Sequence, residues 1–128
     1  WDPFSQNLTN QIKKVQNRAA RFVTGNYDFR ASITELKQSL NWMPLSQRRK
    51  LFRLKMLHKV FYNNSAISRS TYIFEPAYVS ERRDNSRKIC PFHSRTDVFK
   101  CSFFPRSIED WNNLPSDIVE TELSALFF

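Results

Sequence analysis

Apolar residues near the start of the chain recur at the spacing of an α-helix. They occur at i, i+3, i+7, i+10 and i+11, as Ile12, Val15, Ala19, Phe22 and Val23. This spacing makes one apolar stripe, and it predicts a helix over residues 8–24. Gly25, the only glycine of the chain, and Asn26 follow the stripe. Both residue types accept the left-handed conformation that commonly ends a helix.

A second long helix is predicted over residues 46–62, and it has two apolar faces. They consist of Leu51, Leu54, Leu57 and Phe61 on one side and of Phe52, Met56 and Val60 on the other. Because each face needs a neighbour, we expect this helix to be central, with Arg53 on its polar side and His58 packed and hydrogen-bonded. The expected core that joins the helices consists of Ile12, Val15, Phe22, Leu51, Leu54 and Phe61.

The remaining segments are shorter. Ser32 and Glu35 have the spacing of a capping box, which predicts a helix as far as residue 40, before the break at Pro44. Residues 63–95 are loop-rich, and the runs 71–74 and 98–103 favour a short hairpin or edge ribbon. Ser107 begins a further N-cap pattern for a helix that carries Trp111. The acidic residues expected to favour the start of that helix are Glu109 and Asp110.

These patterns predict a mainly α fold. We expect a small bundle of about three basic amphipathic helices, a loop-rich section that includes the hairpin, and a short closing helix. The corresponding segments are 1–64, 65–106 and 107–128, the last ending in an acidic tail that looks truncated. The chain starts with Trp1 rather than methionine and ends in an apolar run over residues 123–128, where a helix could begin, so we expect both ends to be cuts through a longer polypeptide.

The positive charge is concentrated in the first half. The net charge is +8, yet residues 13–59 hold twelve Lys or Arg against two acids, whereas residues 107–128 hold five acids and no base. Such a distribution favours a polyanionic partner, most often nucleic acid, although a solvated basic surface is the alternative. The residues predicted to contact phosphate are Lys14, Arg18, Arg21, Arg48, Lys55, Lys59, Arg82 and Arg83. Near the last two, Tyr78 adds a ring of the kind that stacks on unpaired bases.

No constellation in the sequence predicts catalysis, a cofactor or a metal. One glycine is too few for a phosphate-binding loop, and the scattered carboxylates do not form a two-metal motif. Cys90, His93 and Cys101 supply three zinc-capable side chains where a structural site needs four, and the fourth would have to be His58 or Asp97. Two cysteines indicate a reducing compartment rather than a secreted scaffold, and no apolar run of roughly 20 residues predicts a membrane span.

Four segments stand out in order along nearly the whole chain. They are Trp1-Asp2-Pro3, then Val15-Gln16-Asn17-Arg18-Ala19-Ala20-Arg21-Phe22-Val23, then residues 32–40 followed by Trp42-Met43-Pro44-Leu45 with Arg48-Arg49, and finally Ser102-Phe103-Phe104-Pro105-Arg106-Ser107-Ile108 with Trp111-Asn112-Asn113-Leu114-Pro115. Taken together, these segments resemble the region that follows the polymerase in jockey-like non-LTR retrotransposon reverse transcriptases.

The resemblance implies a parent protein with an endonuclease and an RNA-directed DNA polymerase, which acts in the nucleus or cytoplasm and is not secreted. The polymerase aspartates of such proteins lie upstream, so this fragment is expected to be non-catalytic. Its implied role is to hold template RNA or target DNA next to the polymerase domain of the same polypeptide. The alternative is a structural module that docks on the polymerase domain and has no nucleic-acid role of its own.

Overall fold

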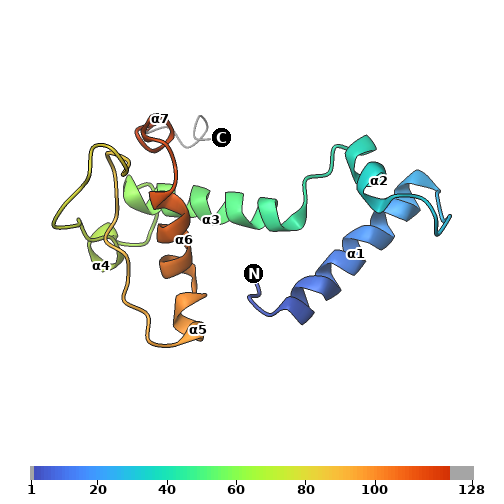
Figure 1. The fold of residues 1–128 in the computed structure, drawn as a ribbon, viewed down its shortest axis with the longest axis horizontal. Helices are drawn as coiled ribbons and strands as arrows, with labels where there is room; N and C mark the ends of the chain where they lie inside the picture. The colour runs from blue at the N-terminus through green and yellow to red at the C-terminus, as the bar shows by residue number, and fades with distance from the viewer. Residues whose placement is uncertain (1, 122–128) are drawn as a thin grey trace. The chain divides into compact units, whose positions relative to one another are not determined.

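The computed structural model describes residues 2–121, and this part of the chain is helical and contains no strand (Figure 1). The mainly α prediction is therefore confirmed. The helices are α1 (Gln6–Thr24), α2 (Ile33–Ser39), α3 (Leu45–Phe61), α4 (Arg69–Tyr72), α5 (Asp97–Lys100), α6 (Phe103–Asn112) and α7 (Ser116–Val119). No helix among these residues is both long and apolar enough to cross a bilayer.

The chain forms two compact units, one up to Arg49 and the other from Lys50 onward, so the boundary in the sequence falls within α3. Residues 50–64, which the sequence analysis grouped with the basic helical segment, therefore belong to the second unit. Residues 122–128 of the expected acidic tail lie outside the described residues.

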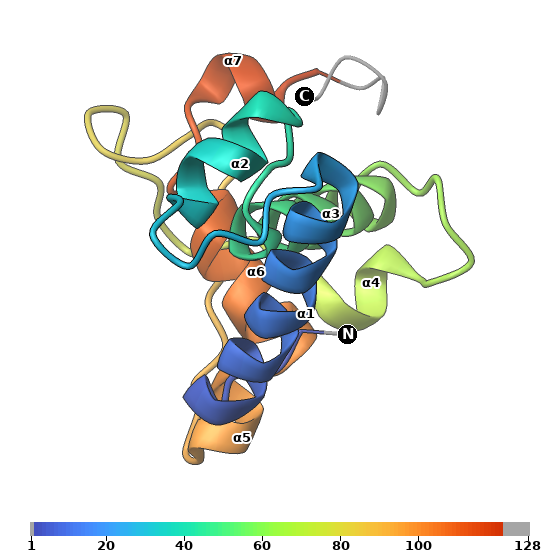
Figure 2. The same cartoon turned by 90° about the vertical axis from the view of Figure 1, so that its right-hand side faces the viewer.

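In the first unit, α1 and α2 lie side by side (Figures 1 and 2). Polar bonds join them and the segment after α2: Lys37 Nζ donates to Asn17 Oδ1 at 3.1 Å, and Gln16 Nε2 donates to the Met43 carbonyl at 3.2 Å. Ala20 is the buried hydrophobic residue of this unit among the described residues. The unit is consequently held by hydrogen bonds and half-buried side chains more than by a large apolar core.

The predicted burial of the α1 stripe is wrong for Val15 and Phe22, whereas Ile12 and Ala19 are half-buried. Val15 is 67% exposed and Phe22 is 75% exposed. The reason is the orientation of α1, which turns Ala20 inward and uses the half-buried Gln16 and Asn17 for the bonds described above. Because α2 has seven residues, it offers too little apolar surface to cover the whole stripe.

Helices α1, α2 and α3 end in the same way. In each, a residue at the C-cap or directly after it has a positive φ. The N–H of the next residue donates to a carbonyl five positions earlier in the sequence, which is a Schellman arrangement. The predicted end at Gly25 is confirmed, with φ of 63° and the Asn26 N–H donating to the Arg21 carbonyl at 3.1 Å. The equivalent positions after α2 and α3 are Asn41 (φ 53°) and Asn63 (φ 55°).

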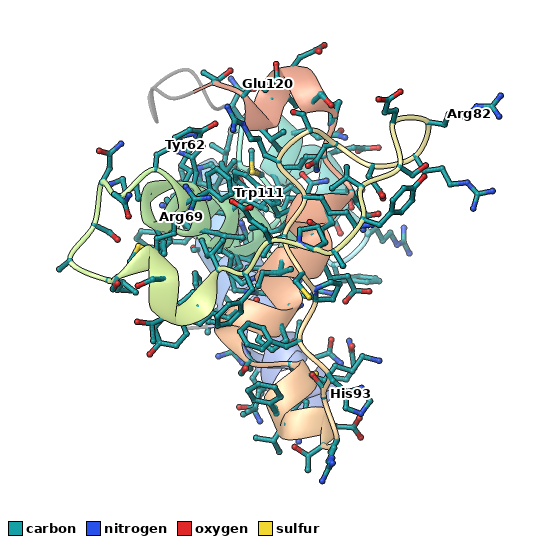
Figure 3. All side chains as sticks on the ribbon, turned by 90° about the vertical axis from the view of Figure 1, so that its left-hand side faces the viewer. Tyr62, Arg69, Arg82, His93, Trp111 and Glu120 are labelled. Carbon is teal, nitrogen blue, oxygen red and sulfur yellow. The ribbon has the colours of Figure 1, made fainter. Side chains whose placement is uncertain are left out.

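The second unit has the larger core, to which α3 and α6 contribute most. Its buried residues are Leu54, Leu57, Val60, Phe61, Ile73, Ile89, Ile108, Trp111 and Val119. The predicted burial of Leu54 and Phe61 is confirmed, whereas Leu51 is half-buried. Phe61 of α3 stacks on Trp111 of α6 with ring centroids 5.2 Å apart, and Trp111 lies in the middle of this unit (Figure 3).

Two details of the second unit differ from the sequence predictions. No strand occurs among the described residues: 71–74 overlaps α4 and 98–103 overlaps α5 and the start of α6. The Cys90 N–H donates to the Phe74 carbonyl at 2.8 Å, so the first of these runs bonds to the loop before α5 rather than to the second run. In addition, α6 begins at Phe103 rather than near Ser107, because Pro105 falls in its first turn, where a missing N–H costs no intrahelical bond.

Candidate nucleic-acid interface

Three of the eight predicted phosphate contacts are exposed cations of the first unit. Lys14 and Arg18 are four residues apart on α1 and therefore share one face of the helix. Arg48 is exposed in the first turn of α3. The unit carries eight basic and three acidic residues, a net charge of +5, so the surroundings of Lys14 and Arg18 favour an anion.

Arg21, the fourth candidate of this unit, has a structural task. It is half-buried, and its guanidinium donates to the Asp28 carbonyl at 2.5 Å, to the Asn26 carbonyl at 3.4 Å and to the Ala31 carbonyl at 3.5 Å. These bonds fasten the loop between α1 and α2. The helical spacing that grouped Arg21 with Lys14 and Arg18 gave no sign of this, because the acceptors lie on irregular backbone.

Exposed aromatic rings lie close to the cations of the first unit. Phe22 follows Arg18 by one helical turn, and Tyr27 and Phe29 are 67% and 83% exposed in the loop after α1. Arg30 lies over the Phe29 ring, 5.4 Å from its centroid. Rings beside guanidinium groups suit unpaired bases and phosphates, and they equally suit an apolar protein surface.

The second unit holds the other four predicted contacts. Lys59 is exposed and Lys55 is half-buried on α3, while Arg82 and Arg83 are exposed in the turn over 81–84. Arg82 projects outward from this loop (Figure 3). The structure thus keeps these two pairs on separate elements of the unit rather than gathering them into one cluster.

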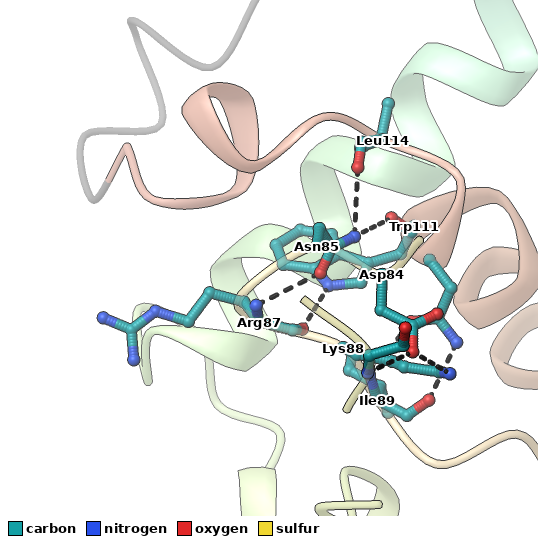
Figure 4. Close-up of polar contacts among 9 residues, drawn as sticks. Asp84, Asn85, Arg87, Lys88, Ile89, Trp111 and Leu114 are labelled. Carbon is teal, nitrogen blue, oxygen red and sulfur yellow. Dashed lines mark hydrogen bonds and ion pairs between the residues drawn. The ribbon is translucent and has the colours of Figure 1, made fainter. Parts of the chain in front are cut away.

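A network of hydrogen bonds orders the loop that carries Arg82 and Arg83, which lies in the segment that the sequence predicts to be loop-rich (Figure 4). Asn85 is 3% exposed, and its Nδ2 donates to the Trp111 carbonyl at 2.9 Å and to the Leu114 carbonyl at 3.1 Å. Asn112 donates to the Ile89 carbonyl at 2.8 Å and accepts from the Ile89 N–H at 2.9 Å. The loop is therefore fixed to the end of α6.

Asp84 fastens the base of the same turn. Its carboxylate accepts from the Ser80 N–H at 2.8 Å and pairs with Lys88 Nζ at 2.7 Å. The hydrogen bond from Lys88 and the bond from the Ser80 backbone hold the pKa of Asp84 below its usual value. Lys88 is thus committed to an internal partner, whereas Arg82 and Arg83 are exposed in the turn that this pair closes.

Arg53 and Asp110 are placed differently from the sequence predictions. Arg53 is 9% exposed rather than on a polar side, and its Nη2 lies 2.8 Å from Asp110 Oδ2, while Lys50 Nζ lies 2.8 Å from Oδ1. Asp110 is near the end of α6, not at its start. Burial raises the pKa of Asp110, but hydrogen bonds from Lys50 and Arg53 outweigh burial and hold the pKa below its usual value. This carboxylate links α6 to α3.

The zinc-capable residues do not form a cluster. Within residues 2–121, no group of three or more His, Cys, Asp or Glu side chains is arranged to hold a metal ion, and Cys90 and Cys101 are free thiols. The prediction for His58 is confirmed: it is fully buried, and its Nε2 bonds to the Thr121 carbonyl at 2.5 Å. Burial lowers the pKa of His58, and this effect outweighs the hydrogen bond to Thr121, which raises it.

Sequence reasoning missed Arg69. This residue lies at the start of α4 with its guanidinium carbon 4.3 Å from the centroid of the Phe61 ring. Because the contact joins the start of α4 to a core residue eight positions earlier, across the loop that follows α3, no helical or strand period predicts it. Comparisons with protein-family models, with curated proteins and with solved structures found no match to this chain.

Proposed function

We propose that this chain is a non-catalytic, nucleic-acid-binding part of a retrotransposon-encoded RNA-directed DNA polymerase. The observation that carries the proposal is the exposed face of α1, where Lys14 and Arg18 stand beside the exposed Phe22 in a unit of net charge +5. Template RNA or target DNA would supply phosphates to the cations and, where unpaired, bases to the rings. The retrotransposon origin rests on the sequence resemblance alone.

The second candidate function is a structural module that docks on an upstream polymerase domain. One observation favours it: Val15, Phe22 and Val23 are all more than half exposed on the same helix. Exposed apolar residues that follow one stripe are typical of a surface that another protein covers. In this alternative the neighbouring cations would serve solubility.

The test is binding of the purified 128-residue chain to a labelled single-stranded RNA and to a duplex DNA over a salt series, after circular dichroism has established helix content. The proposed function predicts binding that weakens steeply with salt. Replacing Lys14 or Arg18 by alanine should each reduce the slope of log K against log salt by about 0.7 to 0.9, the contribution of one phosphate contact.

Lys13→Ala is the matched control, because Lys13 is exposed on the same helix but points away from the face of Lys14 and Arg18. It should leave the slope nearly unchanged. A folded chain that binds neither nucleic acid at low salt would favour the docking module. Equal effects of all three substitutions would mean that net charge alone, and not this face, accounts for binding.

A further inference from the structure

A hollow of about 250 Å³ lies in the second unit between α4 and the loop over 74–88. Its lining combines two aromatic rings, Phe61 and Phe74, with three cations, Arg69, Arg87 and Lys88. A second hollow adjoins it and shares Arg69 and Phe74. Rings and cations that line one cavity are the two components from which sites for single-stranded nucleic acid are built.

We propose that this hollow binds one nucleotide of a single strand, with the phosphate at Arg69 and Arg87 and the base against Phe74. This inference rests on the proposed function and adds a specific site to it. It does not use the α1 face, so the two can be tested separately.

The charges of the hollow favour an anion. The lining contains three cations and one carboxylate. The carboxylate belongs to Glu75, whose side chain is 88% exposed and lies 3.8 Å from Arg69. Lys88 is paired with Asp84 at 2.7 Å. Arg69 and Arg87 are accordingly the cations that the lining offers to a phosphate, and the planar guanidinium matches two phosphate oxygens at once.

The two arginines are held in place by different means. Arg69 lies over the Phe61 ring at 4.3 Å, and Phe61, which is 5% exposed, stacks on the buried Trp111. Arg87 is fixed through its backbone, since its N–H donates to Asn85 Oδ1 and its C=O accepts from Trp111 Nε1. The Arg87 side chain extends away from that network (Figure 4). Fixed attachment points reduce the entropy lost when a ligand binds.

Phe74 provides the surface for a base. It is 49% exposed, lines both hollows, and meets Phe92 edge-on with centroids 6.2 Å apart. The hollow is smaller than the roughly 300–1,000 Å³ of pockets that enclose drug-sized ligands. Its volume of about 250 Å³ lies just below that range, so the hollow suits one nucleotide rather than several, and the adjoining hollow gives the strand a direction in which to continue.

The experiment uses the full chain and a fluorescein-labelled 12-nucleotide oligouridine, with affinity measured by fluorescence anisotropy. Phe74→Ala should weaken binding about tenfold, an effect within the range for loss of one stacked base, and Arg69→Ala and Arg87→Ala should each weaken it several-fold. The matched controls are Phe99→Ala, a ring of similar exposure on α5, and Arg95→Ala, an exposed cation outside the hollow. Both should leave affinity within twofold.

Photocrosslinking locates the bound strand on the unaltered chain, so its result does not depend on whether a variant folds. Oligouridine that carries 4-thiouridine, irradiated in complex with the unaltered chain, should crosslink to the peptide that contains Phe74. Crosslinks confined to α1, or hollow variants that bind as the unaltered chain does while Arg18→Ala weakens binding, would overturn this inference and leave the proposed function standing. Absence of any RNA binding would remove both. Full competition by free uridine monophosphate at equal nucleotide concentration would assign the hollow to a free nucleotide and overturn the strand-binding claim.

Discussion

The indole Nε1 of Trp111 donates a hydrogen bond of 2.9 Å to the backbone carbonyl of Arg87. This bond joins the centre of the core to the loop that lines the hollow, because Trp111 is fully buried and also stacks on Phe61. The aromatic core residue thus fixes the backbone position from which Arg87 extends.

Trp111→Phe should lower the free energy of unfolding by about 2–4 kcal/mol. The substitution leaves the Arg87 carbonyl without its donor and leaves a void where the larger ring stood. Urea denaturation followed by circular dichroism measures the change. Trp42→Phe is the control, since Trp42 is half-buried in the first unit, and it should cost clearly less. Equal losses would show that the Trp111 hydrogen bond and its burial have no special weight.

Asn85→Asp should destabilise the second unit by about 2–3 kcal/mol, because a carboxylate would then face the carbonyls of Trp111 and Leu114 where an amide now donates. The matched control is Asn113→Asp, which removes an equivalent donor to the Glu109 carbonyl at an exposed site. That change should stay within about 0.5 kcal/mol, as is usual for surface substitutions. Similar losses in the two variants would contradict the central role of Asn85.

The ion pairs of Asp110 should make stability depend on acid pH. The folded-state pKa of Asp110 lies below the ordinary value of 3.8, so the stability that it contributes is fully present above pH 3.8 and is lost as pH falls through the lowered pKa. Urea midpoints measured from pH 7 to pH 2.5 should therefore show Asp110→Asn less stable at pH 7, with the difference shrinking at the acid end. A difference that does not vary with pH would exclude this explanation.

His58 should produce a second pH effect nearer to neutrality. Its folded-state pKa lies below the ordinary 6.5, so its neutral form favours the folded chain above pH 6.5. That stability is lost as pH falls from 6.5 through the lowered pKa. His58→Leu should flatten the dependence of the unfolding midpoint between pH 7.5 and 5. His93→Leu, which alters the other histidine at an exposed position, should retain the dependence.

Helices α1, α2 and α3 could be predicted from local signals, since helix formation depends on spacing and caps within one segment, whereas α4 and α5 overlap runs for which strands were predicted. Gly25 ended α1 as expected, and the hydroxyl of Ser32 accepts from the Glu35 N–H at the start of α2. Phe61 and Leu54 could be placed in the core because they share one of the two apolar faces that the sequence predicts for α3. The mainly helical fold followed from these segments alone.

What could not be predicted depends on contacts between distant positions. Arg53 and Asp110 are 57 residues apart, and no period links them. Arg21 could not be separated from Lys14 and Arg18, because its three carbonyl acceptors lie in a loop without regular geometry. Val15 has the spacing of a core residue, yet spacing does not show which face of a helix packs against another element. The hollow at Arg69 and Phe74 likewise arises only from tertiary structure.

The ends of α1, α2 and α3 each contain one residue with a positive φ, and this backbone conformation restricts which residues evolution can accept at those positions. A Cβ on Gly25 would meet no atom within 4 Å, so backbone conformation alone, and not space, selects the residue at this position. Asparagine meets the same demand at positions 41 and 63, because its short amide side chain tolerates positive φ better than most others. Natural variants of this chain should therefore interchange glycine, asparagine and aspartate at these three sites while excluding valine and isoleucine, whatever the partner of the protein.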